Sequence, residues 1–413
     1  MKKELLNKML KLIEEKHLDM YFNITKEELN NYIEEVLKKY ELKDEYDFYY
    51  VANVIIKKIF GIYDSHTKLV WKDADFNLPI RLKYIDGKIF VIRVTDDNKD
   101  LLYSEVLSIN NIPIERLVDE IEKMTAYSTN EYLYTQIENI LYNGIKLKSL
   151  PSIKSDSNSF EFEILKDDQI IKRNLTKSEG YLLPINKPQP NYSYKIINDK
   201  IYIVYNACRE EHEGQMKEFV KEIKKVSEEN NINKYIIDIR GNRGGNSNII
   251  NPLIDYLSGK EAITLVDEYV FSGGRWAVFD LKNIGSKFVG TGIGTSMNCF
   301  GDAPINDIDK FILPISYKYF YFDKDCNRDS FKYSVSENQV TNINLNDKYF
   351  IPFEEMKKNK DYFIPQIFEP DYYVKNSIDD YKNGYDRQLD SAIKLLDLKK
   401  SDVKGEFANS KTR

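Results

Sequence analysis

Apolar residues recur at three- and four-residue intervals near the start of the chain, and this spacing predicts helices. Thr25 and Glu28 have the spacing of a capping box, so a helix is expected to begin there. A further helix is expected over "EYDFYYVANVIIKKIF" and ends at Gly61. We therefore expect an N-terminal helical bundle over residues 1–75, closed by the loop "IYDSHTKLVW".

The pattern changes to short strands and turns over residues 76–190. "LKYIDGKIFVIRV" and "SFEFEILKDDQIIKRNLT" each alternate around a tight turn, which predicts two hairpins. "EVLSINNIPIERL" reads as a strand, an Asn-Asn turn and the start of a helix. These residues are expected to form a small α+β module.

Strands and helices alternate over residues 191–399. "KIYIVYN", "KYIIDI", "AITLVDE" and "KFVG" are short and almost wholly apolar, as in a sheet covered on both faces. The helical patterns between them predict an α/β domain with a mostly parallel sheet, whose sites form at the carboxyl ends of the strands. The polar residues 400–413 are expected to form a flexible tail.

Composition excludes several classes of protein. The 413 residues carry a net charge of only −6, and Lys and Glu are interspersed, which argues against a nucleic-acid binder. The three cysteines form no CxxC pair, so neither a disulfide framework nor a zinc ribbon is expected. No apolar run approaches the length of a membrane span, and the N-terminus does not resemble a signal peptide. A cytoplasmic protein without a cofactor or metal is expected.

Two loops at the ends of consecutive strands are candidates for chemistry. "DIRGNRGGNSN" is a glycine-rich loop before a helix, which favours an anion-binding nest of backbone N–H groups. "VFSGGRW" places Ser272 at the start of a helix, either as a nucleophile beside amide donors or as an ordinary N-cap. A phosphate cradle is the other interpretation of the glycines, but the P-loop Lys-Ser/Thr and GxGxxG are both missing.

A nucleophilic serine needs a base, and the chain has three histidines. His17, among charged residues of the first helix, is expected on the surface, and so is His212 in "CREEHEGQ". His66 lies in the loop "YDSHTKL", where a surface position is again the ordinary interpretation. It is the best candidate base, because Asp64 and Ser65 precede it and are able to fix its tautomer.

Several segments together resemble the S41 serine peptidases, the carboxyl-terminal processing and tricorn-core-like proteases. They are "YIIDIRGNRGG", "LVDEYVFSGG", "KFVGTGIGTSMNCFGD", "YDSHTKL" and the ending "FEPDYYVKNSIDDYKNGYDRQLDSAIKLL". The resemblance implies a ClpP/crotonase-like catalytic core with Ser272 as nucleophile. It also implies an oxyanion hole from Gly273 and an amide of Gly244 or Gly245.

The resemblance also indicates which base to expect. The processing proteases place a lysine in the loop after the next strand, but "GTGIGTSMNCFGD" has none. Tricorn-like enzymes instead use an N-terminal histidine preceded by serine, which Ser65-His66 matches. The chain departs from the family in its Ser-Gly-Gly-Arg nucleophile segment, where Ser-Ala-x-Glu is frequent, and in Thr291, where one branch of the family has a glutamate. The acidic member of a tricorn-like tetrad is not assigned, and Glu337 is a candidate by position alone.

The middle module resembles a degenerate PDZ domain, either a peptide-binding module or a structural cap over the active site. The resemblance implies a serine peptidase that acts on peptides or proteins. Two alternatives remain: a catalytically inactive relative that binds peptides, and an acyl hydrolase acting on small esters. The sequence does not indicate the oligomeric state.

Overall fold

The computed structural model describes residues 2–153, 157–178, 180, 182, 190–336 and 347–398. The expected tail, 400–413, lies outside these residues. The chain forms two units, which are described separately. Unit 1 comprises Met1–Asn186, Asn298–Tyr321 and Phe331–Pro365, and unit 2 comprises Lys187–Met297, Phe322–Ser330 and Gln366–Arg413. Two stretches of the expected third domain, 298–321 and 331–365, thus belong to unit 1.

The N-terminal helices of unit 1 form where the apolar spacing predicts them. They are α1 (Lys2–Lys16), α2 (Lys26–Lys39) and α3 (Glu45–Phe60). The capping box is present, since Thr25 and Glu28 bond reciprocally at the start of α2. Gly61 ends α3 with a positive φ of 55°. Most residues of α3 are buried, which makes it the central helix of this part of the core.

The middle of unit 1 is an antiparallel sheet with helices. Its strands run in the order β2 (Ile80–Ile85), β3 (Lys88–Val94), β4 (Glu105–Ile109), β6 (Ser159–Lys166) and β7 (Gln169–Thr176). Both predicted hairpins are confirmed as β2–β3 and β6–β7. The 3₁₀ helix η1 (Asp96–Leu101) follows β3, and β5 (Ile112–Pro113) pairs with β4. The helices are α4 (Ile114–Met124), α5 (Asn130–Leu141) and α6 (Gly144–Lys148).

Later segments of the chain complete unit 1. One three-stranded sheet contains β1 (Val70–Trp71), β15 (Phe311–Pro314) and β14 (Ile305–Ile308). Another contains β13 (Cys299–Gly301), β16 (Lys318–Tyr321) and β17 (Lys332–Val335). The short helices α10 (Phe353–Met356) and η5 (Lys360–Phe363) follow. Phe300, Phe353 and Phe363 form one aromatic cluster with Phe22 from the loop after α1.

Unit 2 is built on the predicted parallel sheet. Its strand order is β18 (Tyr372–Tyr373), β12 (Lys287–Gly290), β11 (Glu261–Val266), β10 (Lys234–Asp238), β9 (Lys200–Tyr205) and β8 (Tyr192–Ile197). Every neighbouring pair is parallel except β8 with β9. The carboxyl ends of β9 to β12 therefore lie along one edge, where the two candidate loops begin.

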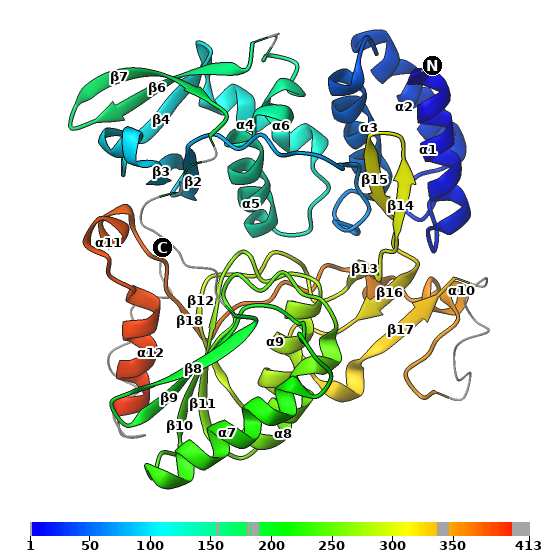
Figure 1. The fold of residues 1–413 in the computed structure, drawn as a ribbon. Helices are drawn as coiled ribbons and strands as arrows, with labels where there is room; N and C mark the ends of the chain where they lie inside the picture. Colours follow the sequence, from blue (N-terminus) through cyan, green and yellow to red (C-terminus); the bar gives the residue numbers. More distant parts are fainter. Residues whose placement is uncertain are drawn as a thin grey trace. The chain divides into compact units, whose positions relative to one another are not determined.

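Helices cover both faces of this sheet (Figure 1). The helical segments of unit 2 are α7 (Gln215–Glu229), η2 (Ser247–Ile250), α8 (Asn251–Leu257), α9 (Gly273–Asn283), η3 (Arg328–Ser330), α11 (Ile378–Asn383) and α12 (Arg387–Asp397). On one face, Ala392 and Leu396 of α12 pack against Ile236 of β10. On the other, the Tyr235 hydroxyl bonds those of Ser227 in α7 and Tyr256 in α8. The alternation of β10 side chains thus places α12 opposite α7 and α8.

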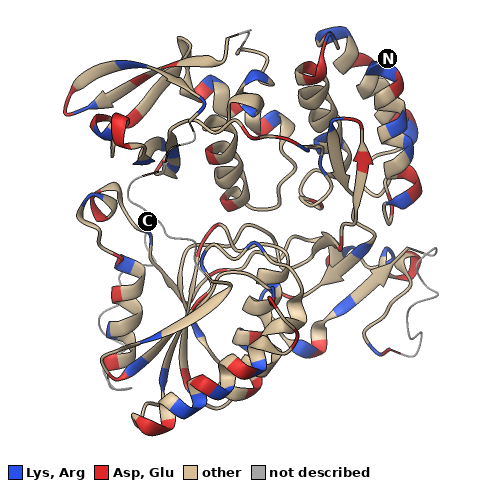
Figure 2. Cartoon of the chain, in the orientation of Figure 1, with Lys and Arg blue, Asp and Glu red and all other residues tan. Residues whose placement is uncertain are grey.

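Charged residues of both signs are interspersed along the exposed side of α7 (Figure 2). Lys224 pairs with Glu228 and Lys225 with Glu229 at i,i+4 spacing. In the described part of the chain, no helix combines the length and apolar character needed to cross a membrane.

Candidate active site

The two candidate loops follow neighbouring strands of unit 2. Asp238, the last residue of β10, is paired in register with Leu265 of β11. The glycine-rich loop begins after Asp238, and the turn that carries Ser272 begins after Val266. Because the strands are parallel, both loops leave the sheet at the same edge. The arrangement expected from the sequence is therefore present.

The two loops pack so closely that only glycine fits at the contact. A Cβ atom on Gly244 would lie 2.5 Å from the backbone nitrogen of Gly273 and 3.0 Å from the Cβ of Ser272. A Cβ on Gly245 would lie 2.4 Å from the carbonyl oxygen of Cys208. Both glycines also have positive φ angles, 99° and 132°. The glycine pair therefore brings its backbone directly against the turn of Ser272.

Asn242 fastens the glycine loop to its surroundings from a fully buried position. Its side-chain nitrogen donates to the carbonyl of Tyr205 at 2.8 Å, at the end of β9. Its side-chain oxygen accepts the N–H of Gly244 at 2.9 Å, and its carbonyl accepts the N–H of Phe271 at 3.0 Å. One side chain and its backbone thus join β9, the glycine loop and the serine turn.

Ser272 has an unusual backbone conformation. It occupies the residue before α9 with φ 52° and ψ −118°, a combination that residues with a side chain rarely adopt. Its side chain makes no capping hydrogen bond to the helix, so the ordinary N-cap interpretation does not describe it. The residue is partly exposed. A strained backbone that presents an unoccupied hydroxyl is typical of functional sites.

Two backbone amides beside Ser272 have no acceptor among the described residues. The N–H of Gly273 is the first of α9, where intrahelical partners are absent, and the N–H of Gly245 also donates to no described residue. The N–H of Gly244, by contrast, donates to Asn242. Of the glycine pair named from the sequence, Gly245 therefore has the available donor, and Gly244 provides the close approach.

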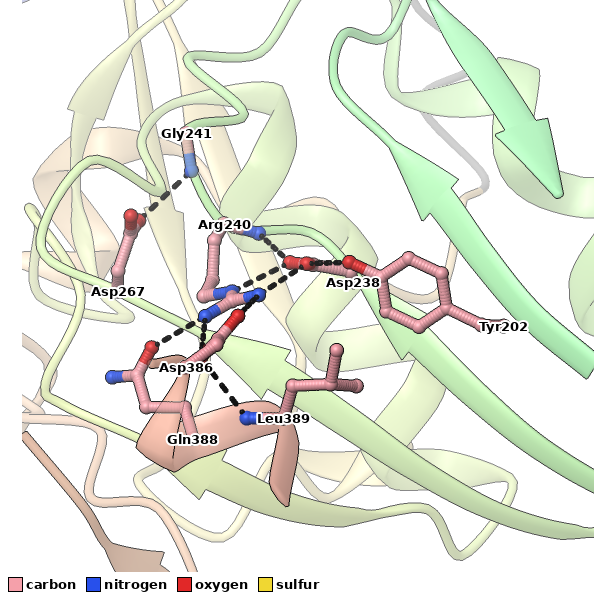
Figure 3. Close-up of polar contacts among 8 residues, drawn as sticks. All are labelled: Tyr202, Asp238, Arg240, Gly241, Asp267, Asp386, Gln388 and Leu389. Carbon is pink, nitrogen blue, oxygen red and sulfur yellow. Dashed lines mark hydrogen bonds and ion pairs between the residues drawn. The ribbon is translucent and has the colours of Figure 1, made fainter. Parts of the chain in front are cut away.

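Arg240 joins several polar residues at the carboxyl-terminal edge of the sheet (Figure 3). The Arg240 guanidinium donates to both oxygens of Asp238, at 2.9 and 2.6 Å, and to both oxygens of Asp386, at 2.9 and 2.8 Å. It also donates to Gln388 at 2.9 Å, while the Tyr202 hydroxyl donates to Asp238. The planar fork of arginine is suited to binding two carboxylates at once. The cluster joins β9 and β10 to the start of α12.

The charges of this cluster stabilise each other. Burial alone would lower the pKa of Arg240, but Asp238 and Asp386 outweigh it and raise that pKa above its usual range. Burial likewise opposes ionisation of Asp386, yet Arg240 keeps the pKa of Asp386 low. Asp386 also accepts the N–H of Leu389 as the N-cap of α12. On the loop itself, Gly241 donates to Asp267 at 2.9 Å.

His66 belongs to unit 1, in the loop between α3 and β1. The loop is anchored on both sides, since Thr67 Oγ1 accepts the N–H of Ser316 and the Tyr63 carbonyl accepts that of Phe300. A Cβ on Gly301 would lie 3.8 Å from Cε1 of the His66 ring. The imidazole thus lies close to a position without a side chain.

Asp64 is the residue that faces the His66 ring nitrogen. One Asp64 oxygen, Oδ1, lies 3.8 Å from His66 Nδ1 and accepts the His66 backbone N–H at 2.7 Å. Burial would raise the pKa of Asp64, but hydrogen bonds from His17 and the nearby His66 and Thr67 lower it overall. The Oγ of Ser65 is buried and makes no hydrogen bond to the ring or to any other described residue.

The expectation for His17 is wrong. Its side chain has no exposed surface, lies against the rings of Phe60 and Phe300, and contacts Asp64 Oδ2 at 3.2 Å. The signal was present in the sequence, because His17 directly follows α1 and continues the spacing of its buried residues Met9 and Ile13. His212 is exposed as expected and pairs with Glu218.

The remaining candidates are placed as follows. Ser272 and its glycines lie in unit 2 and His66 with Ser65 in unit 1, and each group is described within its own unit. Thr291, at the position where one branch of the family has a glutamate, is buried and donates to Glu268 at 3.2 Å. Glu337 lies outside the described residues.

The chain is similar to known proteins in sequence and in fold. The model of peptidase family S41 matches residues 200–286. Among solved structures, mature CPAF has a TM-score of 0.62 at 12% identity, covering 96% of this chain and 97% of that chain. CPAF complexed with lactacystin has a TM-score of 0.60 at 12% sequence identity, and the match covers 96% of this chain and 98% of that chain. The photosystem II D1 C-terminal processing protease has a TM-score of 0.43 at 10% sequence identity, and the match covers 91% of this chain and 93% of that chain.

No curated protein sequence matches the chain. At 12% identity, the likeness to CPAF concerns the fold. The family match is a separate finding, and it covers both the glycine loop and Ser272. The resemblance to S41 peptidases seen in the sequence is thereby confirmed, and the match supports a serine-type peptidase.

Proposed function

We propose that this protein is a serine peptidase in which Ser272 is the nucleophile and His66 the general base. The observation that carries the proposal is the turn of Ser272: its φ is positive, its hydroxyl caps no helix N–H, and two amide donors lie beside it. A plain N-cap serine would need none of these features. The substrate class, a peptide or protein, follows from the family match.

The chemistry is acyl transfer. His66 accepts the proton of the Ser272 hydroxyl as its Oγ attacks the scissile carbonyl, and the carbonyl oxygen becomes an oxyanion. The N–H groups of Gly273 and Gly245 are suited to bind that oxyanion, since neither donates to another group of the described residues. The proton then passes to the leaving amine. Water, deprotonated by the same imidazole, hydrolyses the acyl-enzyme and restores Ser272.

His66 needs one fixed tautomer for this role, with a proton on Nδ1 and a lone pair on Nε2. The Asp64 carboxylate, 3.8 Å from Nδ1, favours that tautomer. Catalytic hydrogen bonds are often long without substrate and tighten when it binds. Ser65 is retained as a candidate for the same task because its buried hydroxyl is adjacent and uncommitted within the described chain.

The finer description of the fold belongs to this proposal. We assign unit 2 to a ClpP/crotonase-like core, on the grounds of its parallel sheet and the nucleophile after β11. The strands β2–β7 with α4 are assigned to a PDZ-like module. The Asn110–Asn111 turn of this module has two positive φ angles, 52° and 60°, in the segment that the resemblance to PDZ domains rests on.

The test is labelling with a fluorophosphonate probe, which reacts covalently with activated serines. Wild type is compared with Ser272→Ala, His66→Ala and the control Ser258→Ala, which changes an exposed serine at the end of α8. We expect the wild type and Ser258→Ala to be labelled, and we expect neither Ser272→Ala nor His66→Ala to be labelled. Labelled protein is then digested to locate the modified residue.

Other outcomes identify other functions. If folded wild type does not label, the protein is an inactive peptide-binding relative. If it labels at Ser272 and hydrolyses small esters but no member of a peptide library, it is an acyl hydrolase. Labelling that persists in Ser272→Ala would exclude this serine as the nucleophile.

A further inference from the structure

Three residues of unit 1 form a buried chain of polar contacts that ends at the proposed base. His17 Nε2 lies 3.2 Å from Asp64 Oδ2, and Asp64 Oδ1 lies 3.8 Å from His66 Nδ1. The side chains of His17 and Asp64 have no exposed surface, while that of His66 is 10% exposed. The contacts therefore run from the interior of the unit toward its surface.

The protonation of His17 follows from its two contacts. The backbone N–H of Asp19 donates to His17 Nδ1 at 3.1 Å, so Nδ1 carries no proton. A neutral imidazole whose Nδ1 is unprotonated carries its proton on Nε2, and Nε2 is the nitrogen that faces Asp64. His17 is thus a hydrogen-bond donor to Asp64, held in one tautomer by a backbone amide. The carboxylate stays ionised and accepts.

Asp64 accepts hydrogen bonds on both carboxylate oxygens, and His17 is the donor to one of them. Its Oδ1 accepts the backbone N–H groups of His66 at 2.7 Å and Thr67 at 3.2 Å. Its Oδ2 has the His17 contact. A buried carboxylate that loses a hydrogen bond is destabilised as an anion, and it either takes up a proton or reorients. Either change would remove the negative charge from the position facing His66 Nδ1.

Packing holds the donor in place. The His17 ring lies 4.4 Å from that of Phe60 and 4.8 Å from that of Phe300, measured between centroids. An apolar side chain would fill this aromatic site without the cost of burying two ring nitrogens. The two ring nitrogens of His17 instead make polar contacts with Asp64 and with the Asp19 amide, which the aromatic rings around them do not require.

We propose that His17 is a positioning residue for catalysis: it holds the Asp64 carboxylate ionised and oriented so that Asp64 fixes the tautomer of His66. This inference rests on the proposed function, because it assigns His66 as the base. His17 itself acts only through Asp64 and does not touch the reacting atoms.

The test compares His17→Phe, which keeps an aromatic ring but cannot donate, with His17→Gln, which keeps a donor and an acceptor. His212→Gln, at an exposed histidine, is the control. His17→Phe is expected to lower kcat and the rate of fluorophosphonate labelling by about tenfold to a hundredfold, through a misplaced base, with KM unchanged. His17→Gln is expected to recover most of that loss. A purely structural role would not favour Gln over Phe in an aromatic site.

The outcomes separate this inference from the proposed function. If wild type does not label at Ser272, or labels independently of His66, the proposed function fails. If labelling depends on His66 but His17→Phe labels at the wild-type rate, or His17→Gln is no better than His17→Phe, the positioning role is wrong.

A measurement on wild type covers the case in which His17→Phe does not fold. Nitrogen-15 NMR of the imidazoles reports the tautomer of each ring directly. His17 is expected as the neutral Nε2–H form, and a proton on its Nδ1 at neutral pH would overturn the proposal.

Discussion

The side-chain oxygen of Asn242 accepts the backbone N–H of Gly244 at 2.9 Å, and this bond sets the path of the loop that faces Ser272. The same side chain donates to the Tyr205 carbonyl. Asn242→Ala would leave both groups buried without a partner, at a cost of about 1–3 kcal/mol each in the free energy of unfolding. We expect a loss of kcat as well, because the Gly245 amide moves with the loop.

Urea unfolding and peptidase kinetics together check this expectation. Asn248→Ala, at an exposed residue of the same segment, is the matched control and is expected to change neither quantity. Normal kcat in a destabilised Asn242→Ala would mean that the loop path does not matter for catalysis.

Gly245→Ala tests the close approach at the site. Its new methyl group would lie 2.4 Å from the Cys208 carbonyl, so the loop has to shift, and kcat is expected to fall. Gly259→Ala is the control: Gly259 also has a positive φ, 76°, but open space around it. Both variants lose about 1–2 kcal/mol of stability from backbone strain. Equal activity of the two variants at a temperature where both are folded would contradict the assigned oxyanion donor.

Arg240→Ala is expected to be strongly destabilising. It removes the cation from the buried Asp238 and from Asp386, whose side chain is 37% exposed. Breaking a fully buried ion pair from one side costs about 3–5 kcal/mol, and solvent screening at Asp386 places the expected loss at the low end of that range. Arg243→Ala, three residues away and exposed, is expected to change stability little. Chemical denaturation of both variants measures the difference. Unfolding midpoints that coincide would show that the cluster contributes nothing to the stability of unit 2.

The buried Asp280 of α9 is expected to make the free energy of unfolding depend on pH. Burial raises its pKa from 3.8 to about 6, although Arg328 donates to it at 2.8 Å and opposes the shift. Between these two values the folded state binds more protons than the unfolded state. Its contribution to stability therefore falls as pH rises from about 4 to about 6, by on the order of 2–3 kcal/mol.

The difference in unfolding free energy between wild type and Asp280→Asn isolates this contribution. Asparagine keeps an acceptor for Arg328 and has no charge to bury. Relative to the variant, wild type is expected to lose stability over that pH range and then level off. A constant difference from pH 4 to 7 would show that Asp280 does not titrate with a raised pKa.

Local patterns were sufficient to predict much of the fold. The Thr25–Glu28 capping box, the end of α3 at Gly61 and both hairpins depend on neighbours within a few residues, and all are confirmed. The parallel strands were recognisable because each is a short apolar run between helical patterns. The glycine loop and Ser272 were found for the same reason, as breaks in these patterns at strand ends.

Distant contacts were not predictable in this way. His17 is buried because Phe300 packs on it from a strand far along the chain, and α1 alone gave only its spacing as a hint. The residues of β13 to β17 were expected in the third domain, whereas they belong to unit 1. The sequence of a strand does not indicate which sheet the strand joins. The pairing of β1 with β15 depends on residues more than two hundred positions apart.

The interleaving of the two units has a consequence for how the protein is made. Unit 1 needs β14 and β15, which the ribosome delivers only after nearly all of the parallel sheet of unit 2. The N-terminal helices therefore emerge long before Ile308 and Phe311 are available to complete their core. Neither unit is a continuous stretch that a single cut would release. Unit 1 is therefore whole only once residues through Pro365 have been synthesised.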